Sequence, residues 1–319
     1  MSKTITNCAG IDTGKFKLDV ALNERAERLQ VTNSPEGHRA LARWLREQRV
    51  KRVGIEASGG YERDVVGELR RKGFVVVVFQ PAQVRAYGYF HLRLAKNDKI
   101  DAGLIADATA ATKKIHAAPD ARLEPFAEHL TMIEQITEDM ARLKTRLETC
   151  RDRRIRKLWE EEIARKKKLA EGEFERLVAA IREHADLAER LALIVSIDGI
   201  GLPTAVAILV RLPEIGTLTR EQAAALVGLA PYDDDSGQYS GARHIKGGRE
   251  RLRTARYRAA LPAAFRWNRA LMALYKRLTG RGKLHKVALV ACARKLLIYA
   301  NTVVARGTPW VSERPAIAA

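Results

Sequence analysis

The sequence predicts an α/β domain over residues 1–120, a helical coiled-coil segment over 121–192 and an all-α domain over 193–319. Three observations support this division. Up to residue 80, short apolar runs alternate with stretches of helical periodicity. From about residue 124 the chain becomes rich in Glu, Lys, Arg, Leu and Ala. From residue 196 apolar helical patterns return, separated by glycine and proline.

The first domain begins with three strand-like runs, of which the first two are joined by a turn at Gly14. Ser34 and Pro35 have the pattern of a helix N-cap and first helical position. The run FVVVVF is typical of a central strand buried on both faces. The predicted strands are 4–11, 16–22, 28–32, 50–56 and 74–79, and the predicted helices are 35–48, 61–72 and 97–116.

Three successive strands followed by alternating helices and strands form the ribonuclease-H-like arrangement, so we expect that fold for the first domain. Fold class alone does not give function. In the middle segment, a heptad-like stripe predicts a pair of long antiparallel helices; its members are Ile133, Ile136, Met140, Leu143 and Leu147. The charged faces of this pair are either plain solvated surface or a dimerising or RNA-contacting coiled coil.

The charge of the chain indicates a polyanionic partner. Its 319 residues carry a formal net charge of +19, with 46% hydrophobic residues, as in a globular protein. From residue 191 onward there are 20 Lys and Arg against 8 Asp and Glu, compared with 37 against 30 before it. Each phosphate that such cations neutralise releases counterions. A basic protein kept soluble by its charge is the alternative.

Three separate cysteines, Cys8, Cys150 and Cys292, form neither a disulfide framework nor a zinc motif, which favours a reducing compartment. The first residues lack the apolar core of a signal peptide. No uninterrupted apolar run approaches about 18 residues, so we expect no membrane span. These features predict a cytoplasmic protein.

Two carboxylates end neighbouring strands of the predicted sheet. Asp12 ends the first strand in GIDTGK, and Glu56 ends the fourth in VGIEASGG. The first and fourth strands of such a sheet lie side by side. Carboxylates at adjacent strand ends are ligands that a hard divalent cation would use.

Asp98 and Asp101 add a second acidic pair. They are three residues apart on a predicted helix and therefore share one face, about 4.5 Å apart along its axis. Asp98 could instead cap the helix. Four converging carboxylates repel one another unless cations bind. We therefore expect Mg²⁺, in two ions about 3.5–4 Å apart, or Mn²⁺. Lys96 and Lys99 flank the pair and either contact phosphate or face solvent.

The C-terminal domain contains two further candidate sites. In SIDGIGLPTAVAIL, Gly199 and Gly201 separate two apolar helices, either as a helix-hairpin-helix element that approaches DNA phosphate or as a tight turn. The loop 230–248 and the helix after it are basic, through Arg243, Lys246, Arg249, Arg251, Arg253, Arg256 and Arg258. Ser236 and Ser240 each precede glycine. A serine beside cations can attack phosphorus, although most loop serines only form turns.

Six motifs in this order resemble the DEDD-type insertion-sequence transposases of the IS110 family. They are GIDTGK, GIEASGGYER, KNDKIDA, SIDGIGLPTAVAIL, AALVGLAPYDDDSG and RGKLHKVALVACARKLL, and the resemblance covers about residues 4–310. The resemblance implies a RuvC-like metal site of Asp12, Glu56, Asp98 and Asp101. It also implies a serine nucleophile, which falls on Ser236 because Ser236-Gly237 directly follows the GLAP segment; Ser240 is the nearby competitor.

The resemblance further implies a homo-oligomer guided by an element-encoded RNA, in which the metal site and a partner's serine form one composite centre and strands exchange through a phosphoserine. One departure is the acidic run Asp233, Asp234 and Asp235 before Ser236, which should repel phosphate unless it reaches a cation. Two alternatives are a junction-resolving metal-dependent endonuclease without a serine intermediate and a non-catalytic DNA- or RNA-binding protein.

Overall fold

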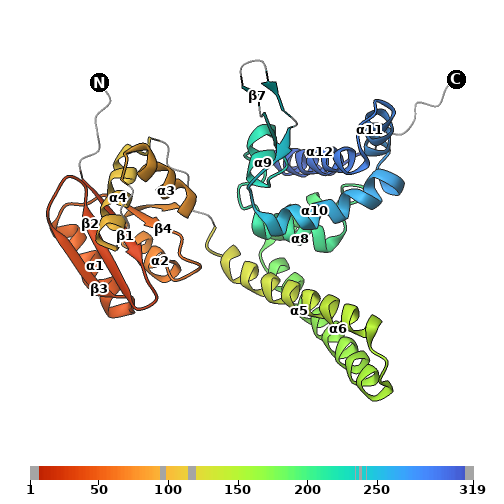
Figure 1. The fold of residues 1–319 in the computed structure, drawn as a ribbon, viewed down its shortest axis with the longest axis horizontal. Coiled ribbons are helices and arrows are strands. Elements are labelled where there is room, and N and C mark those ends of the chain that lie inside the picture. Colours follow the sequence, from red (N-terminus) through yellow and green to blue (C-terminus); the bar gives the residue numbers. More distant parts are fainter. Residues whose placement is uncertain are drawn as a thin grey trace. The chain divides into compact units, whose positions relative to one another are not determined.

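The computed structural model describes residues 7–93, 98–113, 120–233, 235–236, 239–241 and 243–312. By its contacts the chain divides into two compact units, Met1–Ala117 and Ala118–Ala319 (Figure 1). Each unit has its own hydrophobic core. The first unit is an α/β domain and the second is mostly helical, as the sequence predicts.

Unit 1 is built on a five-stranded mixed sheet with the order β3-β2-β1-β4-β5. The strands are β1 (Cys8–Thr13), β2 (Lys17–Leu22), β3 (Arg28–Thr32), β4 (Arg52–Glu56) and β5 (Val75–Phe79). The first three strands pair antiparallel, whereas β1 with β4 and β4 with β5 pair parallel. The first and fourth strands are therefore neighbours, as expected from the order of elements.

Helices cover both faces of this sheet. On one face, Ile11 and Ile55 pack in a core that includes α1 (Pro35–Glu47) and α2 (Arg63–Arg71). Ser34 caps α1 through its hydroxyl, which accepts a hydrogen bond from the Gly37 amide at 3.3 Å, and Pro35 is the first helical residue. The opposite face carries α4 (Asp98–Ala111), which packs on β1, β2 and β4.

The prediction that residues 74–79 form a central strand buried on both faces is wrong. β5 is the last strand of the described sheet, and Val75 and Val78 are 44% and 37% exposed. β-branched residues favour extended backbone at a sheet edge as well as in its centre, so the apolar run did not require burial. The sequence reading also missed α3 (Pro81–Phe90), which begins with a capping box between Gln80 and Gln83.

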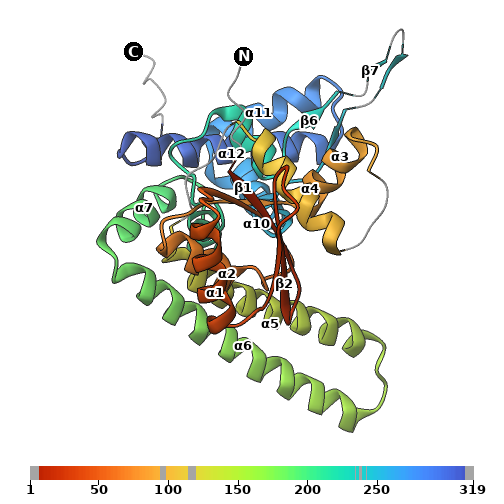
Figure 2. The ribbon, with the colours of Figure 1, turned by 90° about the vertical axis from the view of Figure 1, so that its left-hand side faces the viewer.

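Unit 2 begins with two long helices, α5 (Leu123–Thr149) and α6 (Arg153–Arg182), which lie side by side as the predicted antiparallel pair (Figure 2). Ile133 of the predicted stripe is buried, and Ile136 and Met140 pack partly buried against the core. The remaining helices are α7 (Ala185–Val195), α8 (Leu202–Arg211), α9 (Arg220–Leu226), α10 (Glu250–Pro262), α11 (Arg269–Gly280) and α12 (His285–Arg306), with a π-helix at Ala263–Trp267.

The core of unit 2 is centred on α8 and α12. Every residue from Ala205 to Val210 is buried, and α12 adds Leu289, Cys292 and Leu296. By length and composition α12 is the one described helix apolar enough to cross a membrane. Half of that stretch is buried inside the unit, where it forms core contacts.

The loop predicted at 230–248 contains short paired strands. β6 (Pro231–Tyr232) pairs antiparallel with β9 (His244–Ile245), and β7 (Asp235–Ser236) pairs antiparallel with β8 (Tyr239–Ser240). We call residues 231–245 the serine ribbon; it extends from the helices of unit 2 (Figure 1).

Candidate active site

Asp12 and Glu56 lie at the same end of two paired strands. In the parallel β1–β4 ladder, Gly10 is opposite Gly54 and Ile11 is opposite Ile55, and each acid is the next residue. Side chains alternate along a strand, so each acid shares a face with the glycine two residues before it. Both acids are half-buried. The strand register therefore brings the two predicted carboxylates to one edge and one face of the sheet.

Both glycines mark the place where α4 rests on the sheet. A Cβ at Gly10 would lie 2.2 Å from the Ala102 carbonyl oxygen, and one at Gly54 would lie 1.8 Å from the Thr109 hydroxyl. Neither site can hold a side chain while α4 stays in place. The helix thus lies directly on the face that carries Asp12 and Glu56.

The direction of α4 places its N-terminal turn at the carboxylate end. Later in the helix, the Asp107 carboxylate accepts a hydrogen bond from the side-chain amide of Asn23. The backbone amide of Asn23 donates to the Cys8 carbonyl at the start of β1. Earlier in the helix, Ala102 contacts Gly10. The helix therefore runs antiparallel to β1, and its first turn, with Asp98 and Asp101, points toward the strand end that carries Asp12.

Three side chains of the predicted tetrad, those of Asp12, Glu56 and Asp101, are among the described residues. Asp101 is half-buried, whereas the side chains of Asp98 and Lys99 and the whole of Lys96 lie outside the described residues. Within the described part of the chain, no group of three or more His, Cys, Asp or Glu side chains is close enough to hold a metal ion. Hard oxygen donors on one sheet edge are nevertheless the ligand type that Mg²⁺ binds.

Asp19 is an acidic neighbour that the sequence reading missed. In the β1–β2 ladder it lies directly opposite Asp12, on the same face. Like charges in this position repel. The Asp19 carboxylate is compensated by the Lys17 ammonium at 3.0 Å and the Gln30 amide at 2.6 Å. The alternation in KLDVAL places Asp19 on the opposite face of the strand from Leu18 and Val20, and this pattern could have identified Asp19 as a neighbour of the site.

A turn after β4 fixes the chain next to Glu56. The Glu62 carboxylate accepts hydrogen bonds from the Ser58 amide at 3.0 Å, the Ser58 hydroxyl at 3.1 Å and the Gly60 amide at 2.9 Å. Partial burial disfavours the charged form, but these hydrogen bonds outweigh it and hold the pKa of Glu62 below its usual range. Gly59 and Gly60 adopt φ values of 76° and 114°, which favour glycine.

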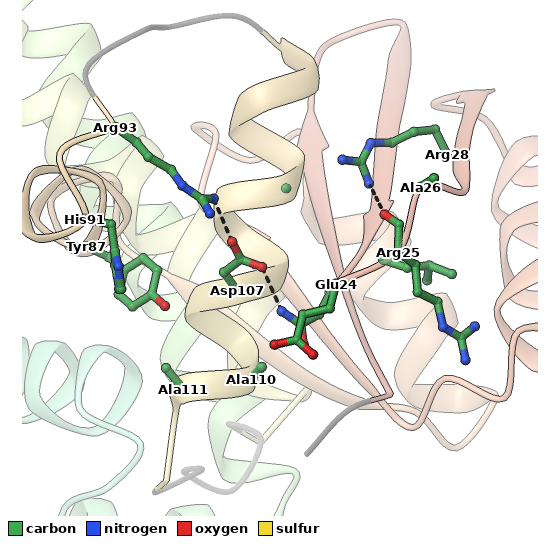
Figure 3. A pocket seen from close by; sticks show the side chains of 13 residues that line it. Glu24, Arg25, Ala26, Arg28, Tyr87, His91, Arg93, Asp107, Ala110 and Ala111 are labelled. Carbon is green, nitrogen blue, oxygen red and sulfur yellow. Dashed lines mark hydrogen bonds and ion pairs between the residues drawn. The ribbon is translucent and has the colours of Figure 1, made fainter. Parts of the chain in front are cut away.

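A groove of about 570 Å³ lies at the other end of α4. Figure 3 shows Arg93 reaching Asp107, whose carboxylate it contacts at 2.6 Å, while Arg25 and Arg28 line the opposite wall. The Asp107 side chain is only 24% exposed, and it joins α4 to Arg93 and Asn23. The predicted carboxylates are not among the lining residues, so this groove is separate from the candidate active site.

Ser236 and Ser240 lie on facing strands of the serine ribbon. Ser236 is paired with Tyr239, and Ser240 with Asp235. Ser236 is exposed, and the Asp233 carboxylate beside it contacts the Arg243 guanidinium at 2.5 Å. One of the three acids that should repel phosphate is therefore neutralised by a cation, while Asp234 lies outside the described residues. Lys246 is exposed near the ribbon base.

The base of the ribbon is held by glycines and arginines. A Cβ at Gly228 would lie 2.0 Å from the Gly247 carbonyl, so the two backbones are in contact. Arg253 donates to the same carbonyl at 2.9 Å. Arg249 makes two hydrogen bonds to the Glu214 carboxylate, at 2.7 and 2.8 Å. These two predicted nucleic-acid residues therefore have internal partners that position the ribbon.

Other predicted nucleic-acid residues also contact the protein itself. Arg251 pairs with Glu134 at 2.9 Å. Gly199 has a φ of 92°, and a Cβ there would lie 2.4 Å from that of Ala263, so this glycine permits close internal packing. Gly201 is exposed and begins α8 as its N-cap. Roles of these residues in nucleic-acid binding stay predictions.

Two protein-family models match the chain. A model of the IS110-type DEDD transposase domain, described as a transposase, matches residues 9–153. A second, described as "Transposase IS116/IS110/IS902 family", matches residues 191–276. The chain belongs to the IS110 family of transposases. No curated protein matches it.

The two matches cover different parts of this IS110-family transposase. The first includes all five strands of the main sheet and α4, and with them Asp12, Glu56, Asp98 and Asp101. The second includes the serine ribbon with Ser236. As an insertion-sequence transposase, the protein binds DNA and cuts and rejoins it, and a DEDD transposase domain usually implies use of a divalent metal.

Proposed function

We propose that this transposase cuts and rejoins DNA strands with a metal-bound tetrad of Asp12, Glu56, Asp98 and Asp101 and with Ser236 as nucleophile. The observation that carries the proposal is the common position of Asp12 and Glu56 on one sheet edge, toward which the first turn of α4 points. The strand order and pairing support a ribonuclease-H-like, RuvC-like fold for residues 1–120, followed by the coiled coil 121–192 and the transposase domain 193–319.

The tetrad would hold two Mg²⁺ ions, for which Mn²⁺ could substitute. Such ions neutralise the carboxylates and stabilise negative charge on the oxygens of a phosphodiester. Asp19, directly opposite Asp12, contacts Lys17 and Gln30, which reduces the repulsion between the two facing acids. The Glu62 turn keeps the backbone after Glu56 in place.

The serine step is a transfer of one phosphoryl group. The Ser236 hydroxyl loses its proton and its oxygen forms a bond to phosphorus, while the bond from phosphorus to a sugar oxygen breaks. That sugar oxygen takes up one proton, so the step involves no net change in protons. In rejoining, the sugar hydroxyl of a second strand attacks the phosphoserine and Ser236 leaves, so the phosphodiester is exchanged without hydrolysis. Exposure of Ser236 on a projecting ribbon, with Arg243 and Lys246 nearby, fits attack on a large polyanion.

We further propose that the transposase works in the bacterial cytoplasm as a homo-oligomer with an element-encoded guide RNA. The net charge of +19 supports binding to both RNA and DNA. In this scheme base pairing of the RNA supplies sequence recognition, and the protein reads the shape and backbone of the nucleic acids.

The test is to incubate the protein with its element's RNA and DNA ends in Mg²⁺ and to look for a covalent protein–DNA species on a denaturing gel. We expect the adduct with wild-type protein and with Ser240→Ala, and its loss with Ser236→Ala. Strand cleavage that persists in Ser236→Ala without any adduct would instead identify a junction-resolving endonuclease. Preserved function in Asp12→Ala would indicate a non-catalytic binding protein.

A further inference from the structure

Unit 2 carries an aromatic surface that includes none of the candidate catalytic residues. It consists of Phe265 and Trp267 on the π-helix Ala263–Trp267, Tyr275 on α11 and His285 at the start of α12. Phe265 is 44% exposed and Trp267 is 62% exposed. We call these four residues the aromatic surface.

The π-helix presents two of these rings on a rigid base. Its inner residues, Ala263 and Ala264, are buried, and Ala263 packs against Gly199. Its end is held by Asn268, whose amide donates to the Asp198 carbonyl at 3.1 Å and whose oxygen accepts from the Leu271 amide at 3.1 Å. Short π-helical turns occur frequently at functional sites.

The other rings form a continuous cluster with Phe265. The Phe265 and Tyr275 centroids are 4.8 Å apart with a tilted, edge-on geometry, and the Phe265 and His285 rings are stacked at 6.2 Å. The Tyr275 hydroxyl and His285 Nδ1 share a hydrogen bond of 2.7 Å. Exposed rings that are fixed by one another lose little side-chain entropy when a planar ligand stacks on them.

The chain segment that carries the aromatic surface has only positively charged side chains. Between Arg251 and Ser312 the sequence has fourteen Lys and Arg and no Asp or Glu. Seven of these cations are exposed on the π-helix, on α11 or in the turn to α12 and its first residues: Arg266, Arg269, Lys276, Arg277, Arg281, Lys283 and Lys286. Such a surface attracts a polyanion at long range and repels a basic one, including a second copy of this chain.

We propose that the aromatic surface binds an unpaired nucleic-acid strand, with bases stacked on Trp267 and Phe265 and phosphates held by the surrounding Lys and Arg. Exposed rings among cations are the combination that single-strand binding uses. A paired strand fits poorly because its bases are already stacked on one another. The inference rests on the proposed function only in requiring a nucleic-acid partner, and it does not depend on the tetrad or on Ser236.

The experiment measures binding of the full-length protein to labelled twelve-nucleotide oligo-dT, oligo-rU and a matched duplex by fluorescence anisotropy. We expect Trp267→Ala to weaken single-strand binding about tenfold, since one stacked base contributes about 1–3 kcal/mol. Trp267→Phe should restore most of the affinity. Tyr89→Ala, at a ring that is 61% exposed in unit 1, is the matched control and should bind as wild type does.

Tryptophan fluorescence gives a second readout. Stacking of a base quenches the indole, so the quench seen on adding oligonucleotide should be smaller in Trp267→Phe than in wild type. Binding is measured in EDTA without Mg²⁺, which separates this inference from the catalytic proposal, and comparison of oligo-dT with oligo-rU shows which strand is preferred. Unchanged affinity and quench in the Trp267 variants, or equal binding of the duplex, would overturn the proposal. A changed oligomeric state of Trp267→Ala in sedimentation, with unchanged binding, would identify a protein-docking surface instead.

Discussion

Gly10 of β1 lies directly opposite Gly54 of β4, and both face α4 at distances that exclude any side chain. Each is followed two residues later by an acid on the same face, Asp12 and Glu56. The Gly-Ile-acid sequence of each strand therefore has two roles. The glycine allows α4 to pack directly on the sheet, and the acid lies near the first turn of α4. This relationship links the packing of unit 1 to its candidate chemistry.

Adding a methyl group at either glycine should separate α4 from the sheet. We expect Gly10→Ala and Gly54→Ala each to lower the free energy of unfolding of unit 1 by about 1–3 kcal/mol, the usual cost of overpacking. Hydrogen exchange of the β1 and β4 amides measures this change. Gly67→Ala is the matched control, because Gly67 lies in α2 with nothing within 4 Å of its missing Cβ. It should be neutral or stabilising by about 0.4–1 kcal/mol; equal loss in all three variants would contradict the packing account.

The Glu62 turn should respond to pH with a defined sign. Because the pKa of Glu62 is lowered in the folded protein, its contribution to stability is fully present above the ordinary value of 4.5 and is lost as the pH falls through the lower folded pKa. The NMR amide shifts of Ser58 and Gly60 should therefore stay constant from neutral pH down to about 4.5 and move only below it.

A Glu62→Gln variant tests the role of this carboxylate in positioning. It should expose the Ser58 and Gly60 amides to exchange at neutral pH and reduce DNA cleavage, while Mg²⁺ restores part of the activity at higher concentration. A variant whose amides exchange as in wild type would show that the carboxylate does not hold the turn.

Glu134 separates two cations in unit 2, which predicts a stability effect. Its carboxylate contacts the Arg211 guanidinium at 2.7 Å and that of Arg251 at 2.9 Å. Burial lowers the pKa of Arg211 and Glu134 opposes that shift. We expect Glu134→Gln to lower the free energy of unfolding by about 1–2 kcal/mol in chemical denaturation, since it leaves two like charges together.

Glu138→Gln is the control for this pair of cations. Glu138 contacts only Arg251 among the described ion pairs, at 3.4 Å, and its side chain is 54% exposed. An exposed pair contributes at most about 0.5–1 kcal/mol. A larger loss of unfolding free energy in Glu138→Gln than in Glu134→Gln would contradict the role of Glu134 between the two arginines.

Local pattern was enough to predict most of unit 1. Strand alternation and helix-capping residues such as Ser34 gave the order of elements, and that order placed Asp12 beside Glu56. The edge position of β5 could not be predicted, because β-branched residues such as Val75 and Val78 are enriched in strands generally and do not distinguish an edge strand from a central one. The pairing of the serine ribbon depends on register between Ser236 and Tyr239, which single-residue patterns do not specify.

Contacts between distant residues were the least predictable part of the candidate site. Arg249 and Arg251 have the composition of a nucleic-acid surface, yet they pair with Glu214 and Glu134, which are 35 and 117 residues away. Likewise, Gly199 has the spacing of a phosphate-contacting turn, but its φ of 92° and its contact with Ala263 are structural reasons for a glycine at this position. Charge and glycine content describe a surface, but the partners of each residue come from the fold.

The most direct test of the account locates the metal in the chain. Fe²⁺ bound in place of Mg²⁺, with ascorbate and peroxide, generates radicals that cut the polypeptide close to the ion, and mass spectrometry reads the cut positions. We predict cuts near Asp12, Glu56 and the first turn of α4, and we expect excess Mg²⁺ to suppress them. Asp12→Asn should abolish these cuts, whereas Glu47→Gln, at an exposed acid of α1, should leave them unchanged. Cuts elsewhere in the chain, or cuts that persist in Asp12→Asn, would contradict a metal site at this edge of the sheet.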